Sequence, residues 1–432
     1  MEELNYFSSI DASVVAQVAD TYGTPVYLYD ENAILRQCEA CLNMPNAYGL
    51  TVRFAMKSNS NRTILKVISG AGLHLDASSI NEVARARLAG IPCENIMLTT
   101  QEIYTGDTMR DLESLLLAGL KYNVCSLNQL RLIADFASKN GLSPGIRIHP
   151  GIGSGESATR NTGDDYACFG VHLSDVKEAL SIAGKKGLKF KHVHVHIGSG
   201  ADSVIWRQNI DLELSIIRRY FPDAESVGFG GGLKEARMPD EVAADLVNLG
   251  DYAKIRIEDF FAQTGRKLRM EIEPGTYIVA NSGYALTRAV DKKSTSRSNF
   301  IVTDGGMEIN SRPLLYGSRH PIYIVAGDGS QVKSSEFLGV PGDYEAVIAG
   351  KCCESGDCQT LDPDGHSVSR AVAEPDIGDI VIIGGTGAYC SSMTPFNYNS
   401  HTQIPEVILT ADHELKLARK RQTLEQMLQN EV

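Results

Sequence analysis

The sequence KHVHVHIGSGADSVIWRQNIDLELSIIRRYFPDAESVGFGGG, residues 191–232, decides the fold. It contains two runs of strand-forming residues, 191–198 and 226–232, separated by a segment with helical periodicity. A strand, a helix and a second strand in this order form the crossover unit of a parallel sheet. This stretch therefore predicts an α/β fold.

The same unit recurs before and after this stretch. Eight strand runs are predicted, joined by seven helical crossovers, and several of the helical segments end in glycine, a common helix stop. Eight such units predict a closed (β/α)8 TIM barrel, and a doubly wound open sheet is the alternative. The runs are TVRFAM (51–56), LHLDA (73–77), NIMLTT (95–100), KYNVCS (121–126), GIRIHP (145–150), KHVHVHIG (191–198), SVGFGGG (226–232) and LRMEIEPG (268–275).

After about residue 280 the pattern changes to short strand runs without crossover helices, which predicts a C-terminal all-β domain. The run VYLYD (26–30) has no helical partner before it, so we expect this N-terminal strand to join the β domain. The polar ending, 416–432, is expected to be a surface helix. The predicted divisions are 1–34 (N-terminal segment joining the β domain), 35–280 (barrel) and 281–432 (C-terminal β domain with a terminal helix).

Composition narrows the class of protein. The 432 residues are 43% hydrophobic and 22% charged, typical of a soluble globular chain of two or three domains. A net charge of −12 argues against a partner that is nucleic acid or an anionic membrane. Nine irregularly spaced cysteines, no signal-peptide pattern and no long apolar stretch favour a reducing cytoplasm.

Candidate functional residues lie where the predicted barrel strands end. In TIM barrels the carboxyl ends of the strands form the active-site face. Each residue alone has an ordinary interpretation, such as a solvated lysine or a flexible glycine turn. All of them map to one rim, which points to a site built from Lys57, Asp76, His196, Ser199, Gly230, Gly231, Gly232 and Glu273.

These residue types suit a phosphorylated aldehyde cofactor. A partly desolvated Lys57 can form a Schiff base. The glycine run lets backbone N–H groups approach a phosphate, and Ser199 adds a hydroxyl donor. Glu273 can pair with a pyridinium nitrogen, and the flat imidazole of His196 can stack on the ring.

A metal site is the rival interpretation. His192, His194 and His196 alternate along one strand, so their side chains point to the same face and could bind a transition metal, as in a barrel metallohydrolase. Glu273 could add a ligand, but Lys57 and the glycine run then have no clear role. A non-catalytic cofactor-carrier barrel is a third class, and such proteins typically lack a second domain.

Six motifs in order carry a family resemblance: FAMKSN, HVHIGSG, GGG, EPG, CESGD and GAY. The chain resembles the bacterial diaminopimelate decarboxylases over nearly its whole length. It is more distantly similar to the ornithine and arginine decarboxylases of the alanine-racemase-like fold. The resemblance implies pyridoxal 5'-phosphate bound by Lys57, and a homodimer whose active sites form between one subunit's barrel and the other's β domain.

The resemblance also implies individual roles. His196 would stack on the cofactor ring and Glu273 would hold its nitrogen. Cys353 of CESGD would reach in from the partner subunit as the acid that protonates the carbanion, and Glu354 would bind the distal ammonium of the substrate. This role for Cys353 argues against a metal at the cysteines near it. The implied phosphate and substrate contacts are Ser199, Gly231, Gly232, Gly275, Arg312, Tyr316 and Tyr389.

The chain departs from the family pattern at Thr276, where EPGT replaces the usual EPGR. Threonine cannot replace a bidentate arginine contact to carboxylate. We therefore expect a D-configured basic amino acid, D-ornithine or D-lysine, to be preferred over meso-diaminopimelate. Arg312 is retained and could still hold a distal carboxylate, so a meso-diaminopimelate decarboxylase that makes L-lysine is the alternative. The carboxylate at Glu273 favours decarboxylation, because a racemase of this fold would have arginine facing the ring nitrogen.

Overall fold

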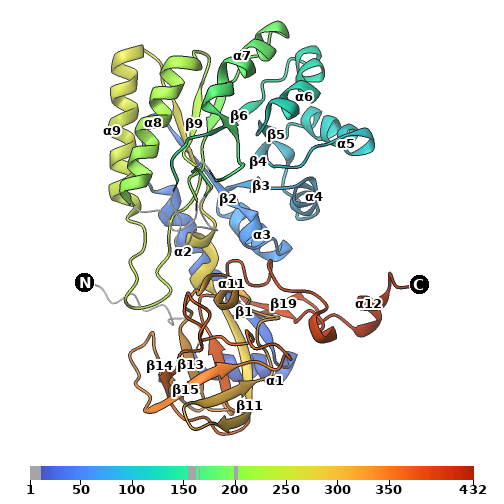
Figure 1. The fold of residues 1–432 in the computed structure, drawn as a ribbon, viewed down its shortest axis with the longest axis vertical. Helices are drawn as coiled ribbons and strands as arrows, with labels where there is room; N and C mark the ends of the chain where they lie inside the picture. The colour runs from blue at the N-terminus through green and yellow to red at the C-terminus, as the bar shows by residue number, and fades with distance from the viewer. Residues whose placement is uncertain (1–10, 154–161, 165, 199–202) are drawn as a thin grey trace. The chain divides into compact units, whose positions relative to one another are not determined.

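The computed structural model describes residues 11–153, 162–164, 166–198 and 203–432, which form two compact units (Figure 1). The barrel unit comprises Gln37–Lys234 and Ala243–Tyr277. The β unit comprises Met1–Arg36, Glu235–Val242 and Ile278–Val432. Two of the boundaries lie within three residues of those expected from sequence.

Eight parallel strands close the barrel. Each pairs in parallel with its neighbours, and the pairing of the fourth strand with the fifth completes the ring. The TIM-like barrel is confirmed, and the open sheet is excluded by this closing pair. A short strand, β7 (Val171–His172), pairs in parallel with the carboxyl end of the fifth strand. The barrel strands are β2 (Leu50–Ala55), β3 (His74–Ala77), β4 (Ile96–Thr99), β5 (Lys121–Val124), β6 (Gly145–His149), β8 (His192–His194), β9 (Ser226–Gly228) and β10 (Arg269–Ile272).

Seven helices connect these strands, as predicted, and surround them in Figure 1. Hydroxyl N-caps start two of them: Ser79 and Ser126 each accept a hydrogen bond from the backbone three residues on. The helices bury an apolar face, as Ile64, Leu65 and Ile68 show in the first. They are α3 (Arg62–Gly70), α4 (Ile80–Leu88), α5 (Gly106–Leu117), α6 (Leu127–Lys139), α7 (Val176–Lys185), α8 (Ser203–Tyr220) and α9 (Leu246–Thr264), and α2 (Glu31–Leu42) precedes β2.

The β unit is a mixed ten-stranded sheet that includes the N-terminal strand. β1 (Val26–Asp30) lies between β11 (Gly283–Ser294), to which it is antiparallel, and β18 (Glu406–Leu409), to which it is parallel. Its expected place in this domain is confirmed. α1 (Ala12–Tyr22) packs Val15, Val18 and Ala19 into the core of this unit. The other strands are β12 (Asn299–Thr303), β13 (Ile322–Val325), β14 (Val332–Ser335), β15 (Tyr344–Ala349), β16 (Arg370–Val372), β17 (Ile380–Ile383) and β19 (Leu415–Arg419).

Short helices complete the described part of the chain: α10 (Thr276–Val279), α11 (Arg312–Tyr316) and α12 (Leu424–Leu428). The expectation of one helix over 416–432 is wrong for its first part, because those residues extend the sheet as β19, antiparallel to β18. The helix begins only after Thr423, whose side chain forms a capping box with Gln426. None of the described helices is long and apolar enough to cross a bilayer.

Residues 235–242 were expected within the barrel domain, but they group with the β unit. Hydrogen bonds explain this: Arg237 Nε donates to the carbonyl of Gly385 at 2.9 Å, and Asn281 Nδ2 donates to that of Ala236 at 2.8 Å. The loop between β9 and α9 thus pairs its polar groups with the β unit. Hydrophobic periodicity carries no signal for such a contact.

Candidate active site

The predicted rim residues of the barrel lie at the carboxyl ends of its strands. Lys57 is in a 3₁₀ turn directly after β2, Asp76 is near the end of β3, and Glu273 follows β10. Burial raises the pKa of both carboxyls, and Lys57 is close enough to each for its positive charge to offset part of that rise, so the three groups lie at one mouth of the barrel. Lys57 itself is exposed, rather than partly desolvated as expected.

The two acids at this mouth are held in a low-dielectric environment. Asp76 is 2% exposed and Glu273 is 8% exposed. Burial raises the pKa of Asp76 to about 7, and the nearby Glu273 carboxylate adds to this rise. Burial also raises the pKa of Glu273, while Lys57 and Arg147 act in the opposite direction. Among the described residues Asp76 Oδ1 is buried with no hydrogen-bond partner, so it could accept a hydrogen bond from a polar ligand.

His194 orients Glu273 from below the mouth. Its Nε2 lies 3.0 Å from Oε1 and 3.1 Å from Oε2 of that carboxylate. Burial lowers the pKa of His194 to about 3, so the ring is neutral and donates the proton of Nε2. Sequence reasoning considered His194 only as a metal ligand. The signal that could have found this role is the shared inward face of residues 194 and 273 on nearby strands.

His196 is held by the glycine run. The N–H of Gly231 donates to His196 Nδ1 at 3.0 Å, so Nδ1 is an acceptor and Nε2 carries the proton. Burial lowers the pKa of His196 well below its usual value, and the cations Lys57 and Arg147 contribute. The ring at this position is therefore a neutral, oriented imidazole.

Neighbouring backbone carbonyls approach the glycine run so closely that no side chain fits there. A Cβ on Gly231 would lie 2.5 Å from the carbonyl oxygen of Glu273, and one on Gly230 would lie 2.4 Å from that of Val195. Gly230 also has a φ of 69°, which favours glycine. The ends of β8, β9 and β10 thus meet around a side-chain-free surface, the kind that suits a phosphate.

Two further predicted cofactor residues, Gly232 and Gly275, lie at this glycine cradle. Gly232 continues the run with a φ of 89°. Gly275 approaches Ser58, since a Cβ there would lie 3.2 Å from Ser58 Oγ. Ser199 lies outside the described residues.

Trp206, which sequence reasoning missed, supports the cradle from behind. Its Nε1 donates to the carbonyl of Gly231 at 3.3 Å, and its ring meets that of Phe229 edge to face at 5.8 Å. Gly231 is therefore held on both sides, by Trp206 through its carbonyl and by His196 through its N–H. Trp206 is the only tryptophan of the chain, and it is 1% exposed.

The structure does not bring His192, His194 and His196 together as a metal site. Among the described residues, the ring nitrogens of His192, His194 and His196 do not converge within ligand distance. The rings of His192 and His194 stack 6.4 Å apart, as expected for alternate residues of one strand, and His192 Nδ1 is within 2.8 Å of Ser226 Oγ. Side chains that share a face of one strand lie in successive layers, so the three cannot surround one ion.

In the β unit, the structure brings together three other predicted residues. The guanidinium of Arg312, at the start of α11, lies over the rings of Tyr316 at 5.8 Å and Tyr389 at 6.0 Å. Arg312 is 1% exposed. Tyr389 has a φ of 59°, an unusual conformation for a residue other than glycine and one that often marks functional sites.

Cys353 and Glu354 lie on an exposed loop of the β unit. The N–H of Cys353 donates to Asn399 Oδ1 at 2.8 Å, and the Tyr398 hydroxyl lies 3.3 Å from the Cys353 carbonyl and 3.4 Å from Glu354 Oε2. The backbone N–H of Gly356 is the main cause of a lowered pKa at Glu354. The loop is thus ordered, yet it presents its thiol and carboxylate to solvent.

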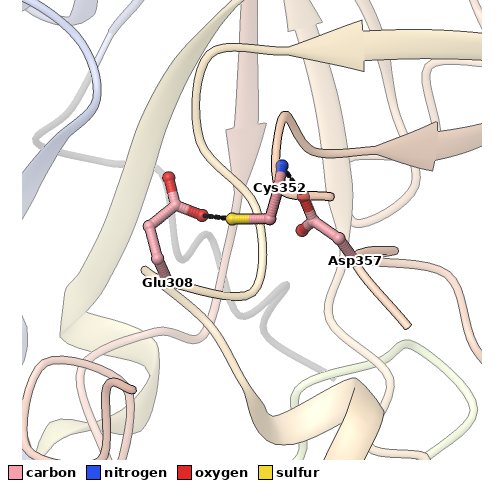
Figure 2. Close-up of side chains that lie close together, drawn as sticks. All are labelled: Glu308, Cys352 and Asp357. Atoms are coloured by element: carbon pink, nitrogen blue, oxygen red, sulfur yellow. Dashed lines mark hydrogen bonds between the residues drawn. The ribbon is translucent and has the colours of Figure 1, made fainter. Parts of the chain in front are cut away.

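Behind this loop lies a cluster of Glu308, Cys352 and Asp357 (Figure 2). Its ligand atoms come within 4.8 Å of one another, which is close enough for a metal ion. However, the two oxygens of Asp357 accept the N–H groups of Met307 and Cys352, each at 2.5 Å. Lys351 lies 3.6 Å from Glu308, so a cation is already present. We interpret the cluster as the anchor of the loop.

Comparison with known proteins identifies the family of the chain. Residues 32–280 match the family described as "Pyridoxal-dependent decarboxylase, pyridoxal binding domain". The chain is 30% identical to the diaminopimelate decarboxylase of Escherichia coli K12, over 98% of each chain. It is similar to a crystal structure of diaminopimelate decarboxylase, with a TM-score of 0.88, 30% identity and 98% coverage of both chains. It is also similar to the Helicobacter pylori enzyme complexed with L-lysine, with a TM-score of 0.78, 26% identity, and coverage of 96% and 98%.

Proposed function

The chain belongs to the pyridoxal-dependent decarboxylases, and from this premise we propose that it decarboxylates meso-diaminopimelate at its D-configured centre to give L-lysine. It is a pyridoxal-phosphate-dependent amino-acid decarboxylase. The observation that carries the more specific proposal is the full-length similarity to diaminopimelate decarboxylases, which supports this substrate better than the D-ornithine or D-lysine expected from Thr276.

The residues at the barrel mouth fit the cofactor. A Cβ at Gly231 would fill the cradle, and Asp76 Oδ1 is buried with no hydrogen-bond partner among the described residues. Lys57 supplies a primary amine near the carboxylates of Asp76 and Glu273. The residues that would hold the cofactor are Lys57, Asp76, His196, Ser199, Gly230, Gly231, Gly232, Glu273, Gly275 and Tyr389.

Bound pyridoxal phosphate supplies an electron-accepting ring that stabilises the charge left at Cα when the carboxylate departs. The chain's own groups prepare that step. The neutral His196, fixed by Gly231, offers a flat face without adding positive charge. Glu273, oriented by His194, is a strong acceptor for a cationic ring nitrogen, because burial raises its pKa.

The β unit would supply the remaining groups. Cys353 would hold the proton that is delivered to Cα, and Glu354 would bind the distal ammonium. Arg312, whose guanidinium lies over the rings of Tyr316 and Tyr389, would bind a substrate carboxylate. The exposure of Cys353 and Glu354 in the single chain supports the proposal that they act in the site of a partner subunit.

Mixing two inactive variants tests this homodimer. If the sites are shared, Lys57→Ala and Cys353→Ala subunits each damage a different half of a site. Random reassortment should then give hybrids with one intact site and recover about a quarter of the wild-type activity. Recovery no greater than the sum of the two variants would rule out shared sites.

Thr276 is the residue that favours a second candidate substrate, D-lysine or D-ornithine. It is the half-buried first residue of α10, directly after Gly275, where the family pattern has arginine. The test is to measure kcat/KM for meso-diaminopimelate, D-lysine and D-ornithine in parallel. We expect meso-diaminopimelate to be preferred, and a clear preference for either D-amino acid would replace our proposal with the second one.

We also propose a cytoplasmic location, supported by nine free thiols.

A further inference from the structure

A cavity of about 210 Å³ lies at the end of the barrel opposite the candidate active site. Its lining includes the first residues of five strands, Lys121 of β5, Gly145 of β6, His192 of β8, Ser226 of β9 and Arg269 of β10. In a parallel barrel these amino ends form the face away from Lys57 and Glu273. The cavity is therefore separate from the cofactor cradle.

One wall of the cavity is apolar. Leu116 of α5 and Ile133 and Ala137 of α6 line it, together with Met97 and Leu142. An engineered hydrocarbon-lined cavity of about 150 Å³ binds benzene, so a wall of this kind can hold a ring or a branched chain. The occupant should have a compact apolar body.

The opposite wall is charged, and its cations exceed its anions. Lys191 pairs with Glu225 at 2.9 Å, and Glu271 pairs with Arg53 at 2.6 Å. Among the described residues, no carboxylate lies within ion-pair distance of the remaining two cations, Lys121 and Arg269. Both line the cavity, in a chain whose net charge is −12.

Two observations indicate that positive charge at this end is incompletely balanced. Arg53 is fully buried behind Glu271, and among the described residues its Nη1 and Nη2 have no hydrogen-bond partner. The pKa of the half-buried Lys121 is lowered, first by burial and then by the cation Arg53, while Glu271 acts in the opposite direction and Arg269 adds to the lowering. The negative charge of an anion beside Lys121 would balance this excess positive charge and raise the pKa of Lys121.

We propose that this cavity binds a small monocarboxylate with an apolar body. Its carboxylate lies between Lys121 and Arg269, and its hydrocarbon part packs against α5 and α6. The positive wall disfavours diamines and basic amino acids, so the ligand differs in class from the substrates of the barrel mouth. Inorganic phosphate matches the charge but leaves the apolar wall unfilled.

Calorimetric titration of the holoenzyme with benzoate tests this site. We expect one benzoate to bind per chain. Benzamide and inorganic phosphate should each bind at least about tenfold more weakly, because benzamide lacks the negative charge and phosphate lacks the apolar ring. Lys121→Met and Arg269→Met should each weaken benzoate binding about tenfold. Lys66→Met, an exposed change on α3 outside the cavity, is the matched control and should bind like the wild type.

A third variant tests the site in a different way, in case the two charge variants lose affinity only because they fail to fold. Ala137→Leu adds volume to the apolar wall and should reduce benzoate affinity while leaving both cations in place. Benzoate binding that survives all three changes, or benzamide binding as tight as benzoate, would overturn the proposal. Because calorimetry reports binding without turnover, the result does not depend on which amino acid the enzyme decarboxylates.

Discussion

The barrel mouth and the Cys353–Glu354 loop both supply groups to the proposed reaction, but they differ in exposure to solvent. At the mouth, Asp76 and Glu273 are almost completely buried, and His194 already orients one of them. On the loop, the thiol and carboxylate are exposed, although the backbone beneath them is firmly anchored by Asp357. In the proposed reaction, the barrel of one chain supplies most of the cofactor site in a buried setting, whereas the proton donor on the loop needs cover from a partner subunit to act out of contact with water.

The largest expected effect is at the mouth. Lys57→Ala should lower kcat by more than about 10⁴-fold, because no other described amine takes its place among the buried acids. The variant should also lose an absorbance band at about 420 nm that borohydride bleaches, the signature of an imine on a reactive lysine. Lys66→Ala is the matched control on α3. An intact band in Lys57→Ala would move the cofactor to another residue.

Cys353→Ala should separate the two regions. We expect it to retain the cofactor and its absorbance band, while kcat falls by about 10² to 10⁴-fold, the usual contribution of one positioned acid. Cys168→Ala, which removes another exposed thiol, should leave kcat unchanged. Near-normal turnover of Cys353→Ala would mean that a group other than this loop delivers the proton.

The burial of the mouth predicts a pH dependence of stability. Asp76 has a pKa of about 7 in the folded protein, against 3.8 for the free group. The folded state therefore keeps a proton that the unfolded chain releases, so this group's contribution is complete below pH 4 and is lost as the pH rises through 7. The loss amounts to at most about 4 kcal/mol. Asp76→Asn should remove this decline in the cofactor-free enzyme.

Urea unfolding of both proteins at pH 5 and pH 8 measures the effect. The gain in stability from Asp76→Asn should be larger at pH 8 than at pH 5. Asp223→Asn changes a partly exposed acid that pairs with Lys189 and serves as the control. Equal gains at the two pH values would show that Asp76 is ionised throughout and that the mouth is wetter than its burial indicates.

The sequence predicted the parts of the molecule that depend on short-range patterns. Alternating strand and helix periodicity predicted the barrel and its seven crossovers, and the position of residues at strand ends predicted the mouth. The strand at Leu415–Arg419 was missed because its charged residues resemble a polar helix until β18 is there to pair with it. Likewise, no motif of the sequence singled out Trp206. Its bond to Gly231 depends on how α8 packs against β9, which no local pattern contains.

That bond gives the smallest predicted effect and the sharpest test of how the mouth is held. Trp206→Phe keeps the aromatic contact with Phe229 but removes one hydrogen bond to Gly231, which should cost about 1 kcal/mol, or roughly fivefold in cofactor affinity. If Trp206 supports a phosphate cradle, titration of the cofactor-free enzyme should show weaker binding of pyridoxal phosphate but unchanged binding of pyridoxal, which lacks the phosphate. Tyr252→Phe, which removes a hydrogen bond to Asp211 on the outside of the barrel, should change neither affinity. Equal weakening of both ligands would instead assign Trp206 to general packing of the barrel.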